Sequence, residues 1–320
     1  MLNRVMRAVV AQAIGCFLLV GLPAMGQMGS LVAPEMKTHL IKSKFVDQTF
    51  EIYVQVPWSK GDGSERFPVL YLTDSYGGMA FEDTTQIMQL GGDVPRFITV
   101  GIGYKMDSPV QSLEIRTRDL THVKGASGLP SLSPFFKGAS ELNLKKKSGG
   151  AADFLRFIRE ELQPLINENY PTIPEDQGYW GDSLGGLFGL YVLFNQPDTF
   201  NRYIIGSPSI WWADRAIMKD AVAYMDSHES LDAKVFMAVG ALEESVGGEE
   251  AAKAAMVTNL FQLADQLRTA NLQGLELTTH LFPNETHSSV IGMNYSRGIQ
   301  TVYTRPKQWM IQEMLAPPKK

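Results

Sequence analysis

One serine lies in a glycine-rich pentapeptide whose residue types suit nucleophilic catalysis. Ser183 is the centre of Gly181-Asp182-Ser183-Leu184-Gly185, between an extended apolar segment and an apolar helical segment. A strand-to-helix turn of this kind holds a serine in a strained, exposed conformation at the carboxyl edge of a sheet. The helix behind it directs its positive end at developing negative charge. The pattern predicts Ser183 as a nucleophile, and the alternative is a glycine-rich turn with an N-capping serine.

A serine hydroxyl needs a base, and position along the chain separates the five histidines. Where a nucleophile occupies such a turn, the acid and then the base follow it in the sequence, so His39 and His122 come too early. His228 lies in a polar segment typical of a helix end. His280 lies inside the last expected strand, whereas His287 lies in the loop after that strand. We therefore predict His287 as the base, with His280 as the alternative.

The imidazole must be oriented, and its cation stabilised, by a carboxylate. The strand expected over Lys234–Gly240 is followed closely by Glu243 and Glu244, with Glu249 and Glu250 further along. Adjacent side chains point in different directions, so only one of the first pair can serve. We favour Glu243, with Glu244 as the alternative; the non-functional interpretation is a pair of solvated surface glutamates.

A tetrahedral intermediate also needs backbone N–H donors. Leu184 follows the serine directly and supplies one donor. The second is expected from the loop after the strand Val69–Thr73, where a turn over residues 74–78 contains two glycines. In that turn we predict Tyr76 as the second donor.

These candidates require a scaffold, and apolar runs alternating with amphipathic segments predict a wound α/β domain. We expect a mostly parallel central sheet with helices on both faces. Residues 104–150 are rich in Gly, Ser, Lys and Pro. We expect an irregular loop or lid insertion there, or alternatively a solvated surface excursion.

The start of the chain predicts export. Arg4 and Arg7 precede an apolar run over Ala8–Leu22 and then small residues. The run of about 15 residues is short of the ~20 that a membrane span needs, so residues 1–26 are predicted to be a cleaved signal peptide. The alternatives are an uncleaved anchor or a lipoprotein site at Cys16. We expect a single mature domain over 27–320, located in the periplasm or secreted.

Composition and spacing argue against several other classes of protein. The net charge of -5 gives no reason to expect nucleic-acid binding. The histidines lack metal-ligand spacing, the single cysteine lies in the leader, and no phosphate-binding glycine-rich loop is present. We expect no cofactor, no metal, no membrane span after signal cleavage, and a small-molecule partner. The sequence carries no signal for an oligomeric state.

Several segments together resemble a known family. They are Pro68–Asp74, Arg116–Thr121, Gly181–Phe188 and Ser207–Trp212. Over roughly residues 36 to 305, the chain resembles the bacterial putative esterase family of α/β hydrolases, and within it the branch of siderophore esterases. S-formylglutathione hydrolases and feruloyl esterases are wider relatives. The resemblance implies the α/β-hydrolase fold and a serine, acid and histidine set, in agreement with Ser183, Glu243 and His287.

The expected function is that of a serine carboxylic ester hydrolase acting through an acyl-enzyme, on siderophore lactone or aromatic acyl esters. Alternatives are an acyltransferase with the same nucleophile and a non-catalytic binding protein that retains the fold. Trp211 and Trp212 are candidates for an aromatic wall beside the serine, or for core residues. Arg118, like Arg116, is a candidate for binding a substrate carboxylate or phenolate, or for surface salt bridges.

Overall fold

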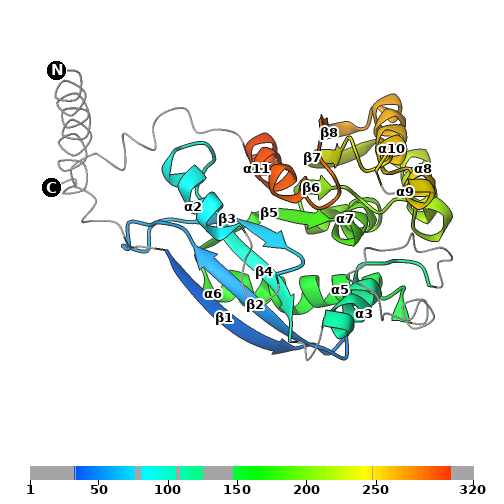
Figure 1. Cartoon of the computed structure of the whole chain (residues 1–320). Coiled ribbons are helices and arrows are strands. Elements are labelled where there is room, and N and C mark those ends of the chain that lie inside the picture. Colours follow the sequence, from blue (N-terminus) through cyan, green and yellow to red (C-terminus); the bar gives the residue numbers. More distant parts are fainter. Residues whose placement is uncertain are drawn as a thin grey trace, which may run out of the picture.

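A computed structural model describes residue 32 and residues 34–75, 81–105, 109–124, 147–246 and 248–303. Within these ranges the fold is built on an eight-stranded sheet of order β1-β2-β4-β3-β5-β6-β7-β8 (Figure 1). β1 and β2 pair antiparallel, β2 pairs antiparallel with β4, and all later pairings are parallel. The strands are β1 (Glu35–Lys42), β2 (Thr49–Val56), β3 (Phe67–Leu72), β4 (Ile98–Tyr104), β5 (Thr172–Asp182), β6 (Arg202–Gly206), β7 (Ser230–Gly240) and β8 (Gln273–Phe282).

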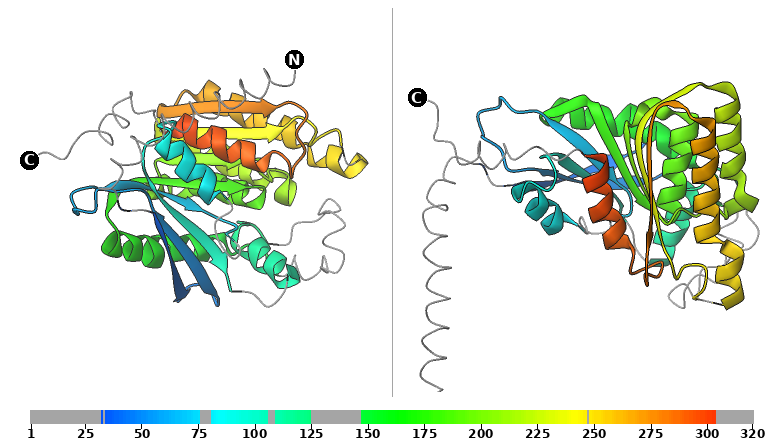
Figure 2. Two further views of the ribbon diagram at one scale, coloured as in Figure 1. Left: turned by 60° about the vertical axis from the view of Figure 1, so that its left-hand side comes forward. Right: turned by 90° about the horizontal axis from the view of Figure 1, so that it is seen from above.

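Helices cover both faces of the sheet, which confirms the predicted α/β fold. They are α2 (Glu82–Leu90), α3 (Pro109–Asp119), α5 (Ala151–Phe157), the π-helical turn η3 (Ile158–Leu162), α6 (Gln163–Asn169), α7 (Leu184–Asn195), the 3₁₀ turn η4 (Pro197–Thr199), α8 (Trp212–Ser227), α9 (Gly248–Ala254), α10 (Met256–Ala270) and α11 (Ile291–Val302). One apolar core contains residues of α5, α6, α7, α8 and α10, and a second contains residues of α2 and α11. In Figure 2 (right), α11 and α10 lie on opposite sides of the sheet.

Burial on both faces explains the continuous apolar runs in the central strands. Every residue of β4 is buried, as is all of β3 except its second residue. The parallel strands β3, β5, β6, β7 and β8 end at the same edge of the sheet, because parallel strands share a direction. Residues that follow these strands therefore gather at one edge, where α/β folds bind their ligands.

The segment expected to be irregular contains regular structure. β4 extends to Tyr104, and Pro109–Asp119 form α3. Leu113, Thr117 and Leu120 are spaced four and three residues apart and are at most 5% exposed, so they form the inner face of this helical segment. Polar residues between them obscured this periodicity. Residues 125–146, which make up much of the predicted lid, lie outside the described residues.

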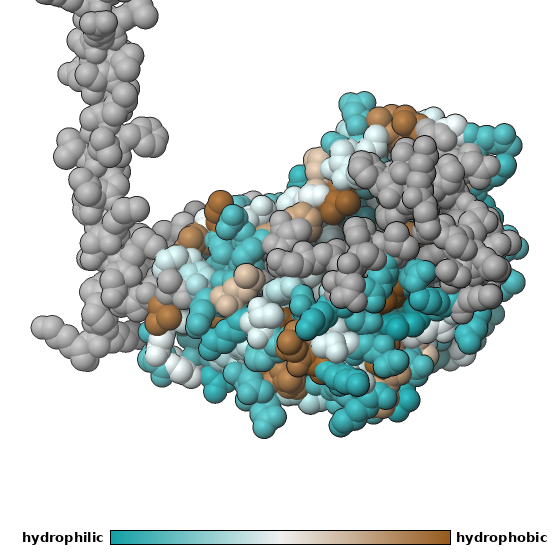
Figure 3. Space-filling model, turned by 60° about the horizontal axis from the view of Figure 1, so that its bottom comes forward, coloured by the Kyte–Doolittle hydropathy of each residue, from teal (hydrophilic) through white to brown (hydrophobic). Residues whose placement is uncertain are grey.

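The leader predicted over residues 1–26 also lies outside the described residues. Among the described helices, none combines the length and hydropathy that a membrane-spanning helix needs. Hydrophilic residues cover most of the described surface in Figure 3, with small separated apolar areas. This mixture is ordinary for the surface of a folded α/β domain.

Candidate active site

Ser183 occupies the turn between β5 and α7 in a strained backbone conformation. Its φ of 61° and ψ of -117° lie in a region that non-glycine residues rarely adopt, at a cost on the order of 1–3 kcal/mol. Its N–H donates to the Gly206 carbonyl at 2.9 Å, and its carbonyl accepts the Ser209 N–H at 3.0 Å. A Cβ at Gly181 would lie 2.5 Å from the backbone of Gly185, so the tight crossing requires glycine there.

The predicted base and acid are in hydrogen-bonding contact with this serine. His287 Nε2 lies 3.0 Å from Ser183 Oγ, and His287 Nδ1 lies 2.6 Å from Glu243 Oε2. A carboxylate at Nδ1 fixes the tautomer with its proton on Nδ1, so Nε2 accepts the serine proton. The His287 side chain is 46% exposed, whereas that of Glu243 is 1% exposed. The base can therefore meet a substrate while the acid stays protected from water.

Both oxygens of Glu243 are fixed. Oε1 accepts the Gly240 N–H at 2.7 Å and the Ser207 hydroxyl at 2.6 Å. Glu244 has a different role, because its carboxylate accepts the N–H and hydroxyl of Thr258, at 2.8 and 2.6 Å, in the first turn of α10. Of the two glutamates that the sequence left open, Glu243 is thus the one in the site.

The site favours the protonated form of His287. Burial lowers the pKa of the imidazole, but the hydrogen bond with Glu243 and the negative charges of Asp182 and Glu243 outweigh it. The net result is a pKa of His287 above its ordinary 6.5, although the charge of Arg116 acts in the opposite direction. The imidazolium formed when serine loses its proton is therefore stabilised.

Asp182, the residue before the nucleophile, is a buried carboxyl group. It is 5% exposed, and burial raises its pKa to about 6 against the opposing effects of the His287 charge and the Asn294 hydrogen bond. Sequence reasoning did not select it, although it belongs to the pentapeptide. Asn294 and Ser207, which link it to Glu243, had no distinguishing signal.

The first predicted oxyanion donor, Leu184, is the first residue of α7, and Tyr76 lies outside the described residues. The loop that leads to Tyr76 is anchored by Asp74, whose carboxylate accepts two hydrogen bonds from Arg116, at 2.7 and 2.9 Å. Arg116 also donates to the Asp182 carbonyl at 3.0 Å. This arginine therefore ties the loop after β3 to the strand that carries Ser183.

Arg118, a candidate for binding a substrate carboxylate or phenolate, forms an ion pair within the protein. Arg118 donates two hydrogen bonds to the buried carboxylate of Asp119, at 2.6 and 3.0 Å. Two residues along a helix turn a side chain by about 200°, so Arg118 points away from the side on which Arg116 meets Asp74. The arginine beside the nucleophile is Arg116.

The two adjacent tryptophans differ in their exposure to solvent. Trp212 is fully buried in the core, and its Nε1–H donates to the Val123 carbonyl at 3.2 Å, so the prediction that it lines a substrate wall is wrong. Trp211 is partly exposed and packs against the same core. A residue that the sequence did not select contacts the nucleophile, since Ser209 Oγ is 3.4 Å from Ser183 Oγ.

The other predictions for the site concern histidines and metals. The alternative base, His280, lies within β8, with its ring 4.3 Å from that of Phe282. No group of His, Cys, Asp and Glu side chains in the described residues could hold a metal ion.

A serine in a strained turn after β5, a glutamate after β7 and a histidine after β8 define an α/β-hydrolase site. The family model described as "Putative esterase" matches residues 43–283, and the chain belongs to this family. The predicted family resemblance is therefore confirmed.

Relatives in the siderophore-esterase branch match most of the chain. The ferri-bacillibactin esterase BesA of Bacillus subtilis is 31% identical over 86% of this chain and 92% of its own length. The siderophore triacetylfusarinine C esterase of Aspergillus fumigatus is 25% identical over 77% of this chain and 86% of its own length. The solved structure of the siderophore hydrolase EstA of Aspergillus nidulans has a TM-score of 0.69, with 25% identity, over 82% of this chain and 92% of its own. Family and relatives together support assignment of the chain as an ester hydrolase.

Proposed function

We propose that this protein is a serine carboxylic ester hydrolase that acts through an acyl-enzyme. The observation that carries the proposal is the continuous chain of hydrogen bonds from Glu243 through His287 to Ser183, at 2.6 and 3.0 Å. A nucleophile within reach of a base that a third group orients is the arrangement that activates a serine hydroxyl.

The proposed reaction has two halves. Ser183 Oγ attacks the ester carbonyl as its proton moves to His287 Nε2, and N–H groups of Leu184 and Tyr76 stabilise the oxyanion. The C–O bond to the alcohol then breaks, and the alcohol leaves with the proton from His287. Water enters, loses a proton to His287 and attacks the acyl-enzyme. The bond between the acyl carbon and Ser183 Oγ then breaks, His287 returns the proton to Oγ, and the acid leaves.

A fluorophosphonate probe tests the nucleophile, because it forms a covalent bond only with an activated serine. We expect the parent protein to be labelled and Ser183→Ala to remain unlabelled. Equal labelling of the two proteins would contradict the assignment.

The proposed substrates are siderophore lactones or aromatic acyl esters. Two observations support this class: relatives are named for bacillibactin and triacetylfusarinine C, and Trp211 offers a partly exposed indole two residues after Ser209. A panel comparing a trilactone siderophore, a feruloyl ester and short p-nitrophenyl esters separates the possibilities. Turnover of the p-nitrophenyl esters without the first two would reject the proposed substrates.

We propose that the enzyme acts in the periplasm or outside the cell after removal of residues 1–26. The support is the basic start, the short apolar run and the small residues that follow it. N-terminal sequencing of the exported protein should find a mature chain that begins at residue 27. An intact leader in the fractionated protein would contradict this.

A further inference from the structure

Asp182 is buried without a cation on its carboxylate. Its Oδ1 accepts the Nδ2–H of Asn294 at 3.0 Å, and no described lysine, arginine or histidine forms an ion pair with it. Arg116 reaches only the backbone carbonyl of the residue. Burying an unpaired carboxylate costs free energy, and such groups concentrate where their charge has a task.

A chain of buried side chains links this carboxylate to the catalytic acid. Asn294 Nδ2 lies between Asp182 Oδ1 and Ser207 Oγ, the latter at 3.4 Å, and the Ser207 hydroxyl donates to Glu243 Oε1 at 2.6 Å. Asn294 and Ser207 are fully buried. Two carboxylates thus share one network, and the second carboxylate ends on His287.

Close backbone approach makes room for this network. A Cβ at Gly206 would lie 2.4 Å from Asp182 Oδ1 and 2.7 Å from Asn294 Nδ2. Any larger residue at the end of β6 would therefore separate the carboxylate from its amide donor.

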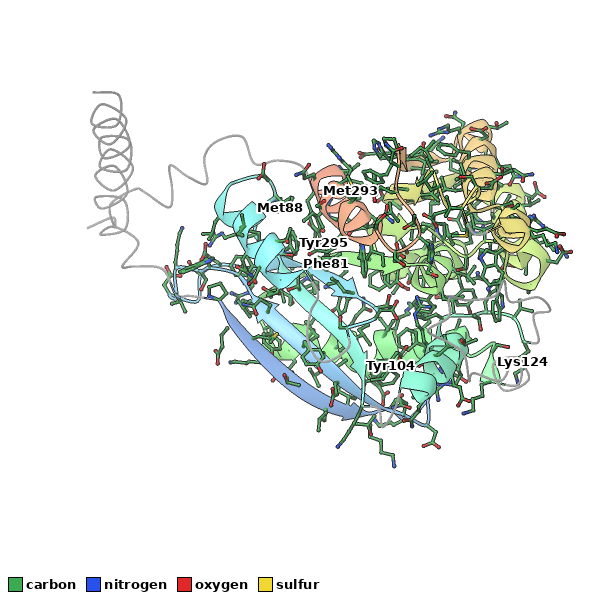
Figure 4. All side chains as sticks on the ribbon, viewed as in Figure 1. Phe81, Met88, Tyr104, Lys124, Met293 and Tyr295 are labelled. Carbon is green, nitrogen blue, oxygen red and sulfur yellow. The ribbon has the colours of Figure 1, made fainter. Side chains whose placement is uncertain are left out.

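The helix that carries Asn294 is held firmly. Tyr295 stacks on Phe81 with ring centroids 4.4 Å apart, and its hydroxyl lies 2.5 Å from Thr85 Oγ1 of α2. Figure 4 shows Phe81 and Tyr295 together between α2 and α11. This packing fixes α11 against α2 and keeps Asn294 turned toward β5 and β6.

We propose that Asp182, held by Asn294, is a positioning residue that acts through His287: its buried negative charge stabilises the imidazolium formed when Ser183 loses its proton. The inference rests on the proposed function, since it gives the second carboxylate a part in that reaction. Among the described residues, the Asp182 carboxylate forms no hydrogen bond with Ser183 Oγ or the His287 ring.

The charges around these two groups support this role. His287 faces the carboxylates of Glu243 and Asp182, and both raise its pKa. Asp182 faces His287, Glu243 and Arg116. Arg116 lowers the pKa of His287, but its guanidinium is paired with Asp74. α11 contributes the neutral Asn294 at this place. Two anions therefore act on the imidazolium against one cation that is already paired.

Asp182→Asn removes the charge with little change in shape. Asn294 Oδ1 is buried with no hydrogen-bond partner among the described residues. If the Asn294 amide turns by half, this oxygen can accept an N–H from the asparagine introduced at position 182. The hydrogen bond is kept, and the variant is expected to fold. The matched control is Asp176→Asn on the same strand, where the carboxylate pairs with Arg202 at 2.6 and 2.8 Å.

The primary measurement is an NMR titration of the His287 ring, assigned by its loss in His287→Ala. We expect Asp182→Asn to lower the titration midpoint of His287 by about half a pH unit or more, and Asp176→Asn to leave it unchanged. On a short p-nitrophenyl ester, the kcat/KM of Asp182→Asn should fall about threefold or more, and the midpoint of its pH profile should move down in parallel.

An unchanged His287 midpoint in a folded Asp182→Asn protein would overturn the inference, and so would an equal shift in Asp176→Asn. A lowered midpoint with undiminished kcat/KM would also overturn it. The titration needs no turnover, so a failure of the proposed function is recognised separately: the parent would then show no esterase activity and no fluorophosphonate labelling.

Discussion

Glu243→Gln is the change that most directly tests the arrangement of the site. Glu243 Oε1 accepts from two fixed donors, the Gly240 N–H and the Ser207 hydroxyl, so the carbonyl oxygen of a glutamine must take that place. The NH₂ group of the glutamine then takes the place of Oε2, which in the parent protein lies 2.6 Å from His287 Nδ1. Nδ1 must accept, the ring proton moves to Nε2, and Nε2 can no longer accept the proton of Ser183.

The size of the effect follows from this tautomer. The same carboxylate-to-amide change, which leaves the histidine in the wrong tautomer, lowers kcat about 10⁴-fold in a serine protease with this arrangement, or roughly 5.5 kcal/mol of transition-state stabilisation. The assay is steady-state hydrolysis of a short p-nitrophenyl ester, with thermal unfolding to show that the variant is folded.

Glu244→Gln is the matched control, because the neighbouring glutamate contacts Thr258 of α10 and not His287. Its kcat should stay within about twofold of the parent value. The reasoning is refuted if Glu243→Gln keeps a tenth or more of the parent kcat, or if Glu244→Gln loses as much as Glu243→Gln.

Three further predictions concern charge. Activity should fall as the pH falls through a midpoint above 6.5, because the pKa of His287 is raised and only its neutral form accepts a proton; a midpoint below 6.5 in the kcat/KM profile would contradict this. Asp182→Asn should increase the free energy of unfolding at pH 8 by up to roughly 3 kcal/mol, since burial raises the pKa of Asp182 to about 6 and the folded state disfavours its charge. That gain in the free energy of unfolding should fade as the pH falls from about 6 to 4, where the folded protein protonates Asp182. Urea unfolding of both proteins at several pH values measures it, and a gain that grows as the pH falls would contradict the reasoning. Arg116→Gln should release Asp74 and the loop after β3, with kcat lowered about tenfold or more because one oxyanion donor loses its position; unchanged kcat would mean that the loop is held without this pair.

Sequence patterns were sufficient where the chemistry depends on chain order and local periodicity. The turn at Ser183, the base after the last strand and the acid after the strand before it follow from the order of strands and helices. α3 was missed because its composition is polar and its buried residues, Leu113, Ile115, Thr117 and Asp119, alternate along the sequence and so carry little helical periodicity.

Side-chain direction could not be predicted for adjacent or near-adjacent residues. Trp211 and Trp212 are equivalent in sequence, but the chain after them passes through three left-handed residues, with φ between 50° and 59° over residues 213–215. Trp212 is the buried one, and its contact with Val123 joins residues 89 positions apart. Likewise, the contact between Asp182 and Asn294 joins residues 112 positions apart, and no local pattern reports it.

The pairing of β7 with β8 continues to its last pair, Gly240 opposite Phe282. The acid lies three residues beyond one of these strands and the base five residues beyond the other, so the main-chain ladder sets their separation. A shift of one residue along β8 would displace the base by about 3.3 Å. Substitution of most side chains leaves such a ladder intact because its hydrogen bonds are made by the main chain. The separation of acid and base therefore depends on the register of β7 and β8 more than on the side chains of these strands.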